Sequence, residues 1–191
     1  MCGSGTLAIE AALIGLNRPP GLLRSNFGFM HLKGFNGTLW NELREKAKKE
    51  AGKAIPARII ATDIDPGAVE AARKNAATAG VERLIEFGVC DYAGTPLPEG
   101  GGVIVLNPEY GERMGEAAKL VDIYKGIGDF FKQKCMGYTG YVFTGNPGLA
   151  RKVGLKPKRS LPFFNSGIEC RLLEYELYEG SKKIKKPKPS S

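Results

Sequence analysis

Short apolar segments alternate with segments of helical length along most of this 191-residue chain, and this alternation constrains the fold more than any other feature. Strands that alternate with helices form a mostly parallel sheet that helices cover on both faces. The sequence therefore predicts an α/β fold. The predicted strands span 58–63, 84–91, 102–106 and 140–144, and the predicted helices span 6–15, 40–54, 66–79 and 117–134.

Two local signals refine this pattern. Asp65 is placed to cap the helix whose first turn contains Pro66. Residues 166–178 are rich in β-forming residues, and we expect them to form a terminal hairpin with residues near Leu161.

The composition is that of an ordinary globular protein, with 42% apolar and 25% charged residues. No apolar run reaches the ~20 residues that cross a bilayer, and no signal peptide opens the chain. The four cysteines form no Cys-x-x-Cys pair, and His31 is the single histidine, so zinc sites and histidine-dependent triads have no basis. We expect a cytoplasmic protein without a metal site.

The net charge of +8 is concentrated at the end of the chain. Residues 180–191 contain five lysines and no acid, which predicts a disordered basic tail after one domain over residues 1–179. Such a tail either keeps the chain soluble or contacts RNA phosphates. If the tail contacts RNA, the chain could also be a non-enzymatic fragment that binds RNA, and this alternative stays open.

A glycine-rich loop, Gly3-Ser4-Gly5, leads directly into the first predicted helix. Glycines let the backbone approach a ligand closely, and the start of a helix offers free N–H donors. The alternative is a tight turn with no ligand. With Ala8, the loop also matches a permissive dinucleotide-binding pattern.

Asp63 ends the predicted strand 58–63 and suits hydrogen bonds to the two hydroxyls of a ribose. Helix capping is the alternative role, but Asp65 fits that role better. In a nicotinamide-binding fold the acid would follow the glycines by about 20 residues. The far longer separation here disfavours a nicotinamide oxidoreductase.

Asn107-Pro108-Glu109-Tyr110 follows the predicted strand 102–106. The amide oxygen of Asn107 and the carbonyl of Pro108 can both accept hydrogen bonds from an exocyclic amine, and the ring of Tyr110 can stack on a base. A polar turn is the alternative. We assign the second Asn-Pro pair, at 146–147, to such a turn.

The order of these three features resembles the bacterial THUMP-associated RNA methylases, which make N2-methylguanosine in large-subunit ribosomal RNA. Residues 1–6 are similar to the end of that family's Asp-Pro-Met-Cys-Gly-Ser-Gly-Thr motif, and residues 107–113 to its Asn-Pro-Pro-Tyr-Gly-Glu-Arg loop. Residues 20–29 with Trp40, residues 62–66 and residues 164–170 are also similar to family segments. The resemblance covers nearly all of the chain before the tail.

The resemblance implies a Rossmann-like class I methyltransferase sheet, a partner RNA and the cofactor S-adenosylmethionine. It implies no metal and no dedicated general base. The family's Asp-Pro and the strand that carries it are absent, so we expect the sheet to lack its first strand and the chain to be a fragment. The implied cofactor-binding residues are Gly3, Ser4, Gly5, Asp63 and Asp91, and the implied catalytic residues are Asn107, Pro108 and Tyr110.

Three alternatives to ribosomal guanine stay open at this point, namely a guanine in transfer RNA, an adenine amine and a protein glutamine amide. Glu109 stands where the family has proline, and we expect its side chain to face solvent. The whole interpretation requires that the loops around Gly5, Asp63 and Asn107 meet in a single cleft.

Overall fold

A computed structural model describes residues 1–110, 117–165 and 167–178 of the chain. The chain divides into two compact units, Met1–Pro96 and a second that begins at Leu97. The basic tail over 180–191 lies outside the described residues. The single domain over 1–179 stays a prediction.

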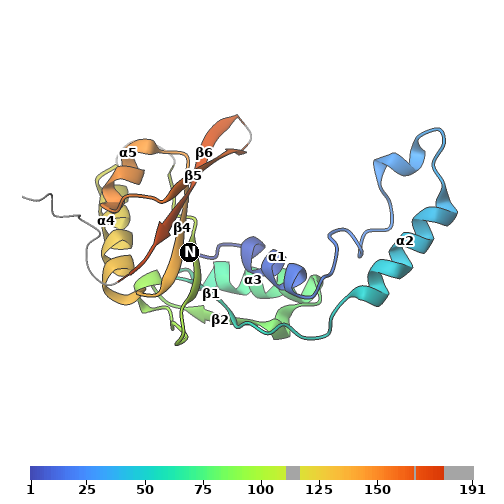
Figure 1. The fold of residues 1–191 in the computed structure, drawn as a ribbon, viewed down its shortest axis with the longest axis horizontal. Coiled ribbons are helices and arrows are strands. Elements are labelled where there is room, and N and C mark those ends of the chain that lie inside the picture. Colours follow the sequence, from blue (N-terminus) through green and yellow to red (C-terminus); the bar gives the residue numbers. More distant parts are fainter. Residues whose placement is uncertain (111–116, 166, 179–191) are drawn as a thin grey trace, which may run out of the picture. The chain divides into compact units, whose positions relative to one another are not determined.

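The first unit is built on two parallel strands, β1 (Ile59–Asp63) and β2 (Ile85–Val89). Both strands contact α3 (Pro66–Thr78) and α1 (Thr6–Gly15), as Figure 1 shows. Asp65 caps α3, as predicted, because its carboxylate accepts a hydrogen bond from the N–H of Gly67. Short 3-10 turns at Glu82–Leu84 and Tyr92–Gly94 flank β2.

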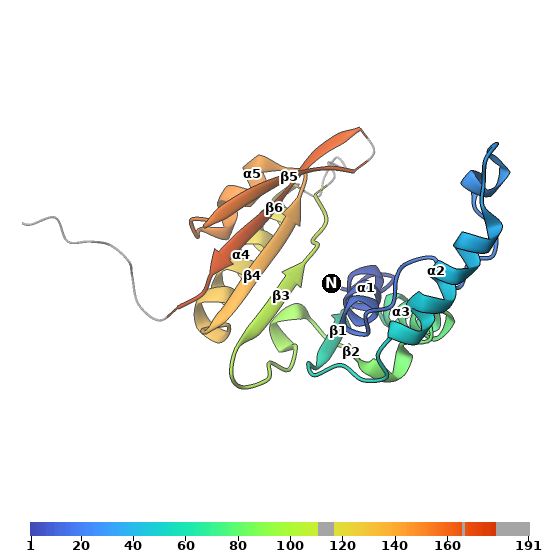
Figure 2. The ribbon, with the colours of Figure 1, turned by 45° about the vertical axis from the view of Figure 1, so that its right-hand side comes forward.

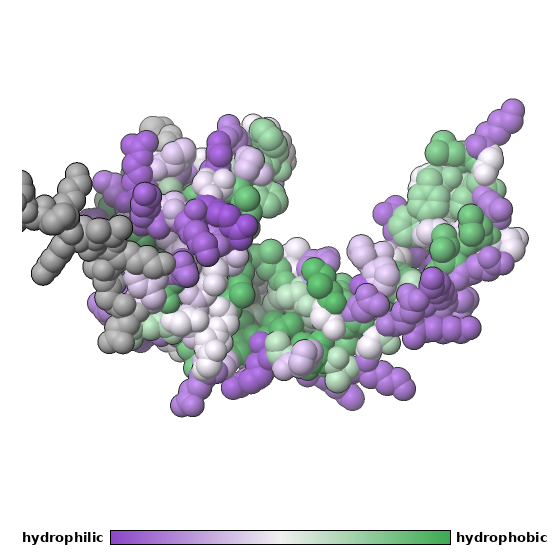
Figure 3. All heavy atoms as spheres, viewed as in Figure 1, coloured by the Kyte–Doolittle hydropathy of each residue, from purple (hydrophilic) through white to green (hydrophobic). Residues whose placement is uncertain are grey.

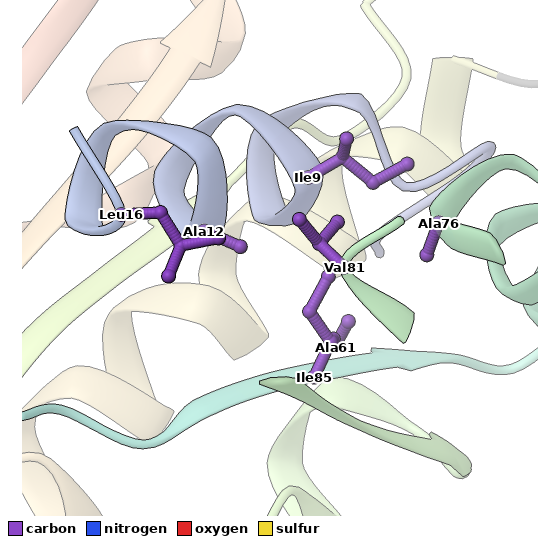
Figure 4. Packing of buried hydrophobic residues seen from close by; sticks show 7 residues of the cluster. All are labelled: Ile9, Ala12, Leu16, Ala61, Ala76, Val81 and Ile85. Atoms are coloured by element: carbon purple, nitrogen blue, oxygen red, sulfur yellow. The ribbon is translucent and has the colours of Figure 1, made fainter. Parts of the chain in front are cut away.

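Small side chains let the helices of the first unit approach its strands closely. Three alanines at this contact are buried almost completely, one each from α1, β1 and α3. Larger aliphatic residues from α1 and from the segment around β2 fill the remaining space (Figure 4). The buried cluster consists of Ile9, Ala12, Leu16, Ala61, Ala76, Val81 and Ile85.

The segment between α1 and β1 projects from the first unit as an arm (Figure 2). It contains a 3-10 turn, Gly28–His31, and α2 (Gly37–Glu50), and none of its described residues from 17 to 58 is buried. The rings of Phe27 and Phe29 pack edge-on against Trp40. Phe29 and Leu39 are exposed, and Figure 3 shows hydrophobic residues at the surface of the arm. The predicted helix 40–54 begins earlier, because Asn36 accepts a hydrogen bond from Leu39 N–H and caps α2.

The second unit contains a four-stranded sheet in the order β3-β4-β6-β5. Its strands are β3 (Gly102–Leu106), β4 (Tyr138–Thr144), β5 (Arg159–Asn165) and β6 (Ile168–Glu176). β3 and β4 are parallel, whereas β6 runs antiparallel to both β4 and β5. The predicted terminal hairpin is therefore confirmed, and it makes the sheet mixed rather than mostly parallel.

Helix α4 (Ala117–Lys134) packs on this sheet through its apolar side. Phe131 lies against Gly140 of β4, and the hydroxyl of Tyr124 hydrogen-bonds to that of Thr144 over 2.7 Å. A short helix, α5 (Pro147–Ala150), and a 3-10 turn, Arg151–Val153, follow β4 and contact α4. The predicted turn at 146–147 is wrong, because Asn146 caps α5 through the N–H groups of Gly148 and Leu149.

The predicted α/β class is confirmed by this arrangement of helices and strands. In the described part of the chain, β1 pairs only with β2, and β3 pairs with β4 alone. Among residues 1–110, 117–165 and 167–178, no helix combines the length and the apolar character of a membrane span.

Replacing Gly128 by alanine should destabilise the second unit strongly. A β-carbon at Gly128 of α4 would lie 1.8 Å from the backbone oxygen of Val153, so the helix and the following turn would have to separate. Overpacking of this kind costs about 3 kcal/mol, or roughly 6–12 °C in the thermal midpoint for a chain of this size. Gly37→Ala is the matched control, because its β-carbon meets only ordinary contacts. Equal midpoints for the two variants would contradict this account of the packing.

Candidate functional site

The glycine loop, Gly3-Ser4-Gly5, contacts α3 of the first unit, and one of these contacts requires a glycine. Gly5 has φ +84°, and a β-carbon there would lie 2.8 Å from the side chain of Ala72 on α3. The amide of Asn75 donates to the backbone oxygen of Ser4 over 2.9 Å. Gly3 has φ +52°, with open space where its side chain would be. Gly5 is thus needed for packing, whereas Gly3 leaves room for a ligand.

Asp63, at the end of β1, holds this loop through its carboxylate. One oxygen accepts a hydrogen bond from Gly3 N–H over 2.9 Å, and the other accepts one from Asp65 N–H over 3.1 Å. Burial alone would raise the pKa of Asp63. The two N–H donors and the positive amino terminus of Met1 outweigh burial and hold this pKa below its ordinary value. The oxygen that faces Asp65 keeps a further lone pair for a ligand donor, whereas the oxygen that faces Gly3 also lies 3.6 Å from the amino terminus of Met1.

Asp91 lies just after β2 and is exposed. Its carboxylate accepts a hydrogen bond from Ala93 N–H and caps the short turn that follows, a role that the sequence did not suggest. The neighbouring residue, Cys90, donates its N–H to the backbone oxygen of Asp63 over 2.9 Å. The ends of β1 and β2 therefore bring the two predicted acids to one edge of the first unit.

Cys2 lies beside the glycine loop without serving as a reactive thiol. Its side chain packs against the buried cluster of the first unit. Burial, and then the negative charge of Asp63, raise the pKa of this thiol, so it stays protonated at neutral pH. We assign Cys2 to packing.

Asn107 begins the loop after β3, and its side chain is exposed. It makes no hydrogen bond to any residue that the structure describes, so its amide oxygen is available to a ligand. Pro108 is buried, which fixes the backbone beside Asn107. The side chain of Glu109 is exposed, as expected from the sequence.

Tyr110 is the last described residue of this loop, and its side chain contacts β4, the residue that follows β4, and the β5–β6 hairpin. Its hydroxyl accepts a hydrogen bond from the amide of Asn165 over 2.9 Å. Its ring packs edge-on against Phe143, with 6.2 Å between centroids, and lies against the backbone of Gly145. Sequence reasoning missed these three partners as site residues, although residues 164–165 belong to one of the family-like segments.

The structure thus gathers the predicted site residues into two groups. The cofactor group lies in the first unit, and the base-binding group lies in the second. That the two groups meet in one cleft stays a prediction. The cofactor group is Gly3, Ser4, Gly5, Asp63 and Asp91, and the base-binding group is Asn107, Pro108 and Tyr110.

Residues 1–174 match the family model described as the RMKL-like methyltransferase domain. The chain is 40% identical over 185 residues to the ribosomal RNA large subunit methyltransferase K/L of Syntrophotalea carbinolica, covering 94% of this chain and 26% of that protein. The crystal structure of SMU.472, a candidate methyltransferase complexed with SAH, is similar with a TM-score of 0.84. It is 28% identical and covers 95% of this chain and 48% of that one.

A further solved structure, described as a predicted N6-adenine-specific DNA methylase from Listeria monocytogenes, is similar with a TM-score of 0.79. It is 31% identical and covers 92% of this chain and 44% of that one. The chain spans less than half the length of the first curated relatives that it matches.

Proposed function

The chain belongs to the family of RMKL-like methyltransferase domains, and on this premise we propose that it transfers a methyl group from S-adenosylmethionine to the N2 amine of a guanine in large-subunit ribosomal RNA. The family expected from the sequence motifs is confirmed by the family match. The name of the Syntrophotalea relative supports a ribosomal RNA substrate. The SAH bound to SMU.472 supports the cofactor, because SAH is what remains of S-adenosylmethionine after methyl transfer.

The observation that carries the proposal is the hydrogen bond from Gly3 N–H to the carboxylate of Asp63. This bond places an ionised acid beside a glycine whose missing side chain leaves open space. The remaining lone pair of Asp63 fits a hydroxyl of the cofactor ribose. Gly3, Ser4 and Gly5 would line its methionine end, and Asp91 would meet the adenine amine.

The base-binding group would hold the amine that receives the methyl group. The amide oxygen of Asn107 and the carbonyl oxygen of Pro108 each accept one N–H of the amine, which turns its lone pair toward the methyl donor. The ring of Tyr110 stacks on the base, which must leave its helix at a cost of a few kcal/mol. S-adenosylmethionine supplies an electrophilic methyl group, so alignment of the amine provides much of the rate acceleration.

An adenine N6 amine is the second candidate acceptor. The Listeria neighbour supports it through its description as an adenine-specific methylase. Two hydrogen-bond acceptors beside an aromatic ring suit either amine. The name of the Syntrophotalea relative favours RNA over DNA, and the sequence resemblance favours guanine.

Binding and product identity test this proposal in turn. We expect calorimetry to give a dissociation constant of about 1–100 μM for S-adenosylmethionine. RNA from a strain lacking the gene is then incubated with the protein, and its nucleosides are identified by mass spectrometry. N2-methylguanosine in large-subunit RNA is the expected product. N6-methyladenosine would select the second candidate, and the absence of cofactor binding would refute methyl transfer.

A further inference from the structure

The contacts of Tyr110 point to a role for Asn165. We propose that Asn165 is a positioning residue that fixes the Tyr110 ring in the orientation in which it stacks on the target base. This inference rests on the proposed function, because that function makes Tyr110 the stacking group. Both residues belong to the second unit, and they are 55 positions apart in the chain.

The hydroxyl of Tyr110 serves as an acceptor within the protein. The Nδ2 amide of Asn165 donates to it over 2.9 Å, and the thiol of Cys170 is a second, weaker donor over 3.7 Å. These two donors account for both lone pairs of the phenolic oxygen. The hydroxyl therefore anchors the ring, and the ring itself is the part that remains available to a base.

The ring is also confined from the side of β4. A β-carbon at Gly145 would lie 2.9 Å from two carbons of the Tyr110 ring and 3.0 Å from a methyl group of Ile168. Phe143 meets the same ring edge-on at 74°. These contacts limit how far the ring can shift. The hydrogen bond from Asn165 holds the hydroxyl end of the ring, which restricts the swing of the side chain about its Cα–Cβ bond.

The geometry of β5 explains why Asn165 is the residue that reaches Tyr110. Alternate residues of a strand face the same side, so Asn165 shares its face with Phe163. Phe163 packs edge-on against Phe143, with 6.1 Å between centroids. That face of the hairpin is therefore turned toward Tyr110, whereas Phe164 on the opposite face is 77% exposed.

Because Asn165 is exposed, its replacement can change the orientation of Tyr110 without destabilising the fold. Its side chain is exposed, and β5 is an edge strand with no buried residue. A hydrogen bond in water contributes little to global stability, because water replaces it when it is lost. Loss of the Asn165 amide should therefore change the ring orientation while the thermal midpoint stays within about 2 °C of the wild-type value.

Five variants of the protein test the inference by kinetics. Asn165→Leu keeps the approximate size of the side chain but cannot donate, and we expect kcat/KM for RNA to fall by about 10- to 100-fold with unchanged binding of S-adenosylmethionine. Asn165→Asp should retain activity within about threefold, because its carboxylate can accept the Tyr110 O–H. Tyr110→Phe alone should cause a loss similar to that of Asn165→Leu, and adding Tyr110→Phe to Asn165→Leu should cause little further loss. Asn41→Leu on the exposed face of α2 is the matched control.

Fluorine NMR supplies a readout that needs no substrate. With 3-fluorotyrosine at position 110, we expect Asn165→Leu to shift the fluorine resonance, and Asn41→Leu to leave it in place. An unchanged resonance in Asn165→Leu, or kinetic losses of Asn165→Leu and Tyr110→Phe that multiply in the double variant, would overturn the inference. A protein without methyl transfer would refute the proposed function, and the NMR comparison would still decide whether Asn165 orients the ring.

Discussion

Asp63→Asn is expected to weaken the binding of S-adenosylmethionine by about 100-fold. The carboxylate of Asp63 accepts hydrogen bonds from Gly3 N–H and Asp65 N–H, and in the proposed function its free lone pair accepts a hydrogen bond from the cofactor ribose. An asparagine has one oxygen, so its NH₂ group must face either one of these N–H donors or the ribose. Hydrogen bonds to charged groups contribute about 1.5–3 kcal/mol each, and 2.7 kcal/mol is roughly 100-fold in affinity. Calorimetry on the purified variant measures the change.

Asp65→Asn provides the matched control for this prediction. It makes the same chemical change two positions away, where the side chain caps α3. Asparagine caps helices as well as aspartate does, so we expect the affinity for S-adenosylmethionine to stay within about twofold. If the two variants lost equal affinity, the loss would reflect a general change of charge. The assignment of Asp63 to the ribose would then be wrong.

The elements of this fold were predictable where a signal lies within the element itself. The predicted ranges 6–15, 102–106 and 117–134 coincide with α1, β3 and α4. Periodic apolar residues or a compact apolar run mark each of them, with Gly5 at the start of α1. Helix α2 begins three residues before the predicted position, because Asn36 caps it and lies in a segment that shows no periodicity.

The order of the site residues along the chain was predictable from the sequence, but the contacts between them were not. Asp63 could be singled out because it ends an apolar strand, but its bond to Gly3 spans 60 positions. The bond between Asn165 and Tyr110 depends on which strands become neighbours in the second sheet. Local patterns in a sequence carry no record of such neighbours. The roles of Asn146 and Asn107 differ for the same reason, since both precede a proline and only Asn146 opens a helix.

Asn107→Ala is expected to lower kcat by about 100- to 1,000-fold without changing the affinity for S-adenosylmethionine. The Asn107 amide makes no hydrogen bond to the described part of the chain, so its removal leaves the surrounding structure intact. The amine of the base would lose one of the two acceptors that orient its lone pair. Removing one preorganised polar group from a reacting centre costs about 3–4 kcal/mol in the transition state. Single-turnover kinetics at saturating cofactor and RNA measure the step directly.

Asn146→Ala separates this effect from the general loss of an Asn-Pro pair. The amide oxygen of Asn146 accepts hydrogen bonds from the N–H groups of Gly148 and Leu149 over 3.0 Å each, so its loss removes a helix cap. We expect about 1 kcal/mol of destabilisation, or roughly 2–4 °C in the thermal midpoint, with kcat within about threefold of the wild-type value. Asn107→Ala should therefore lower the rate and leave stability unchanged, whereas Asn146→Ala should lower stability and leave the rate nearly unchanged. If Asn107→Ala lost stability and kept its rate, the loop after β3 would be a structural turn, and the amine would have to be held elsewhere.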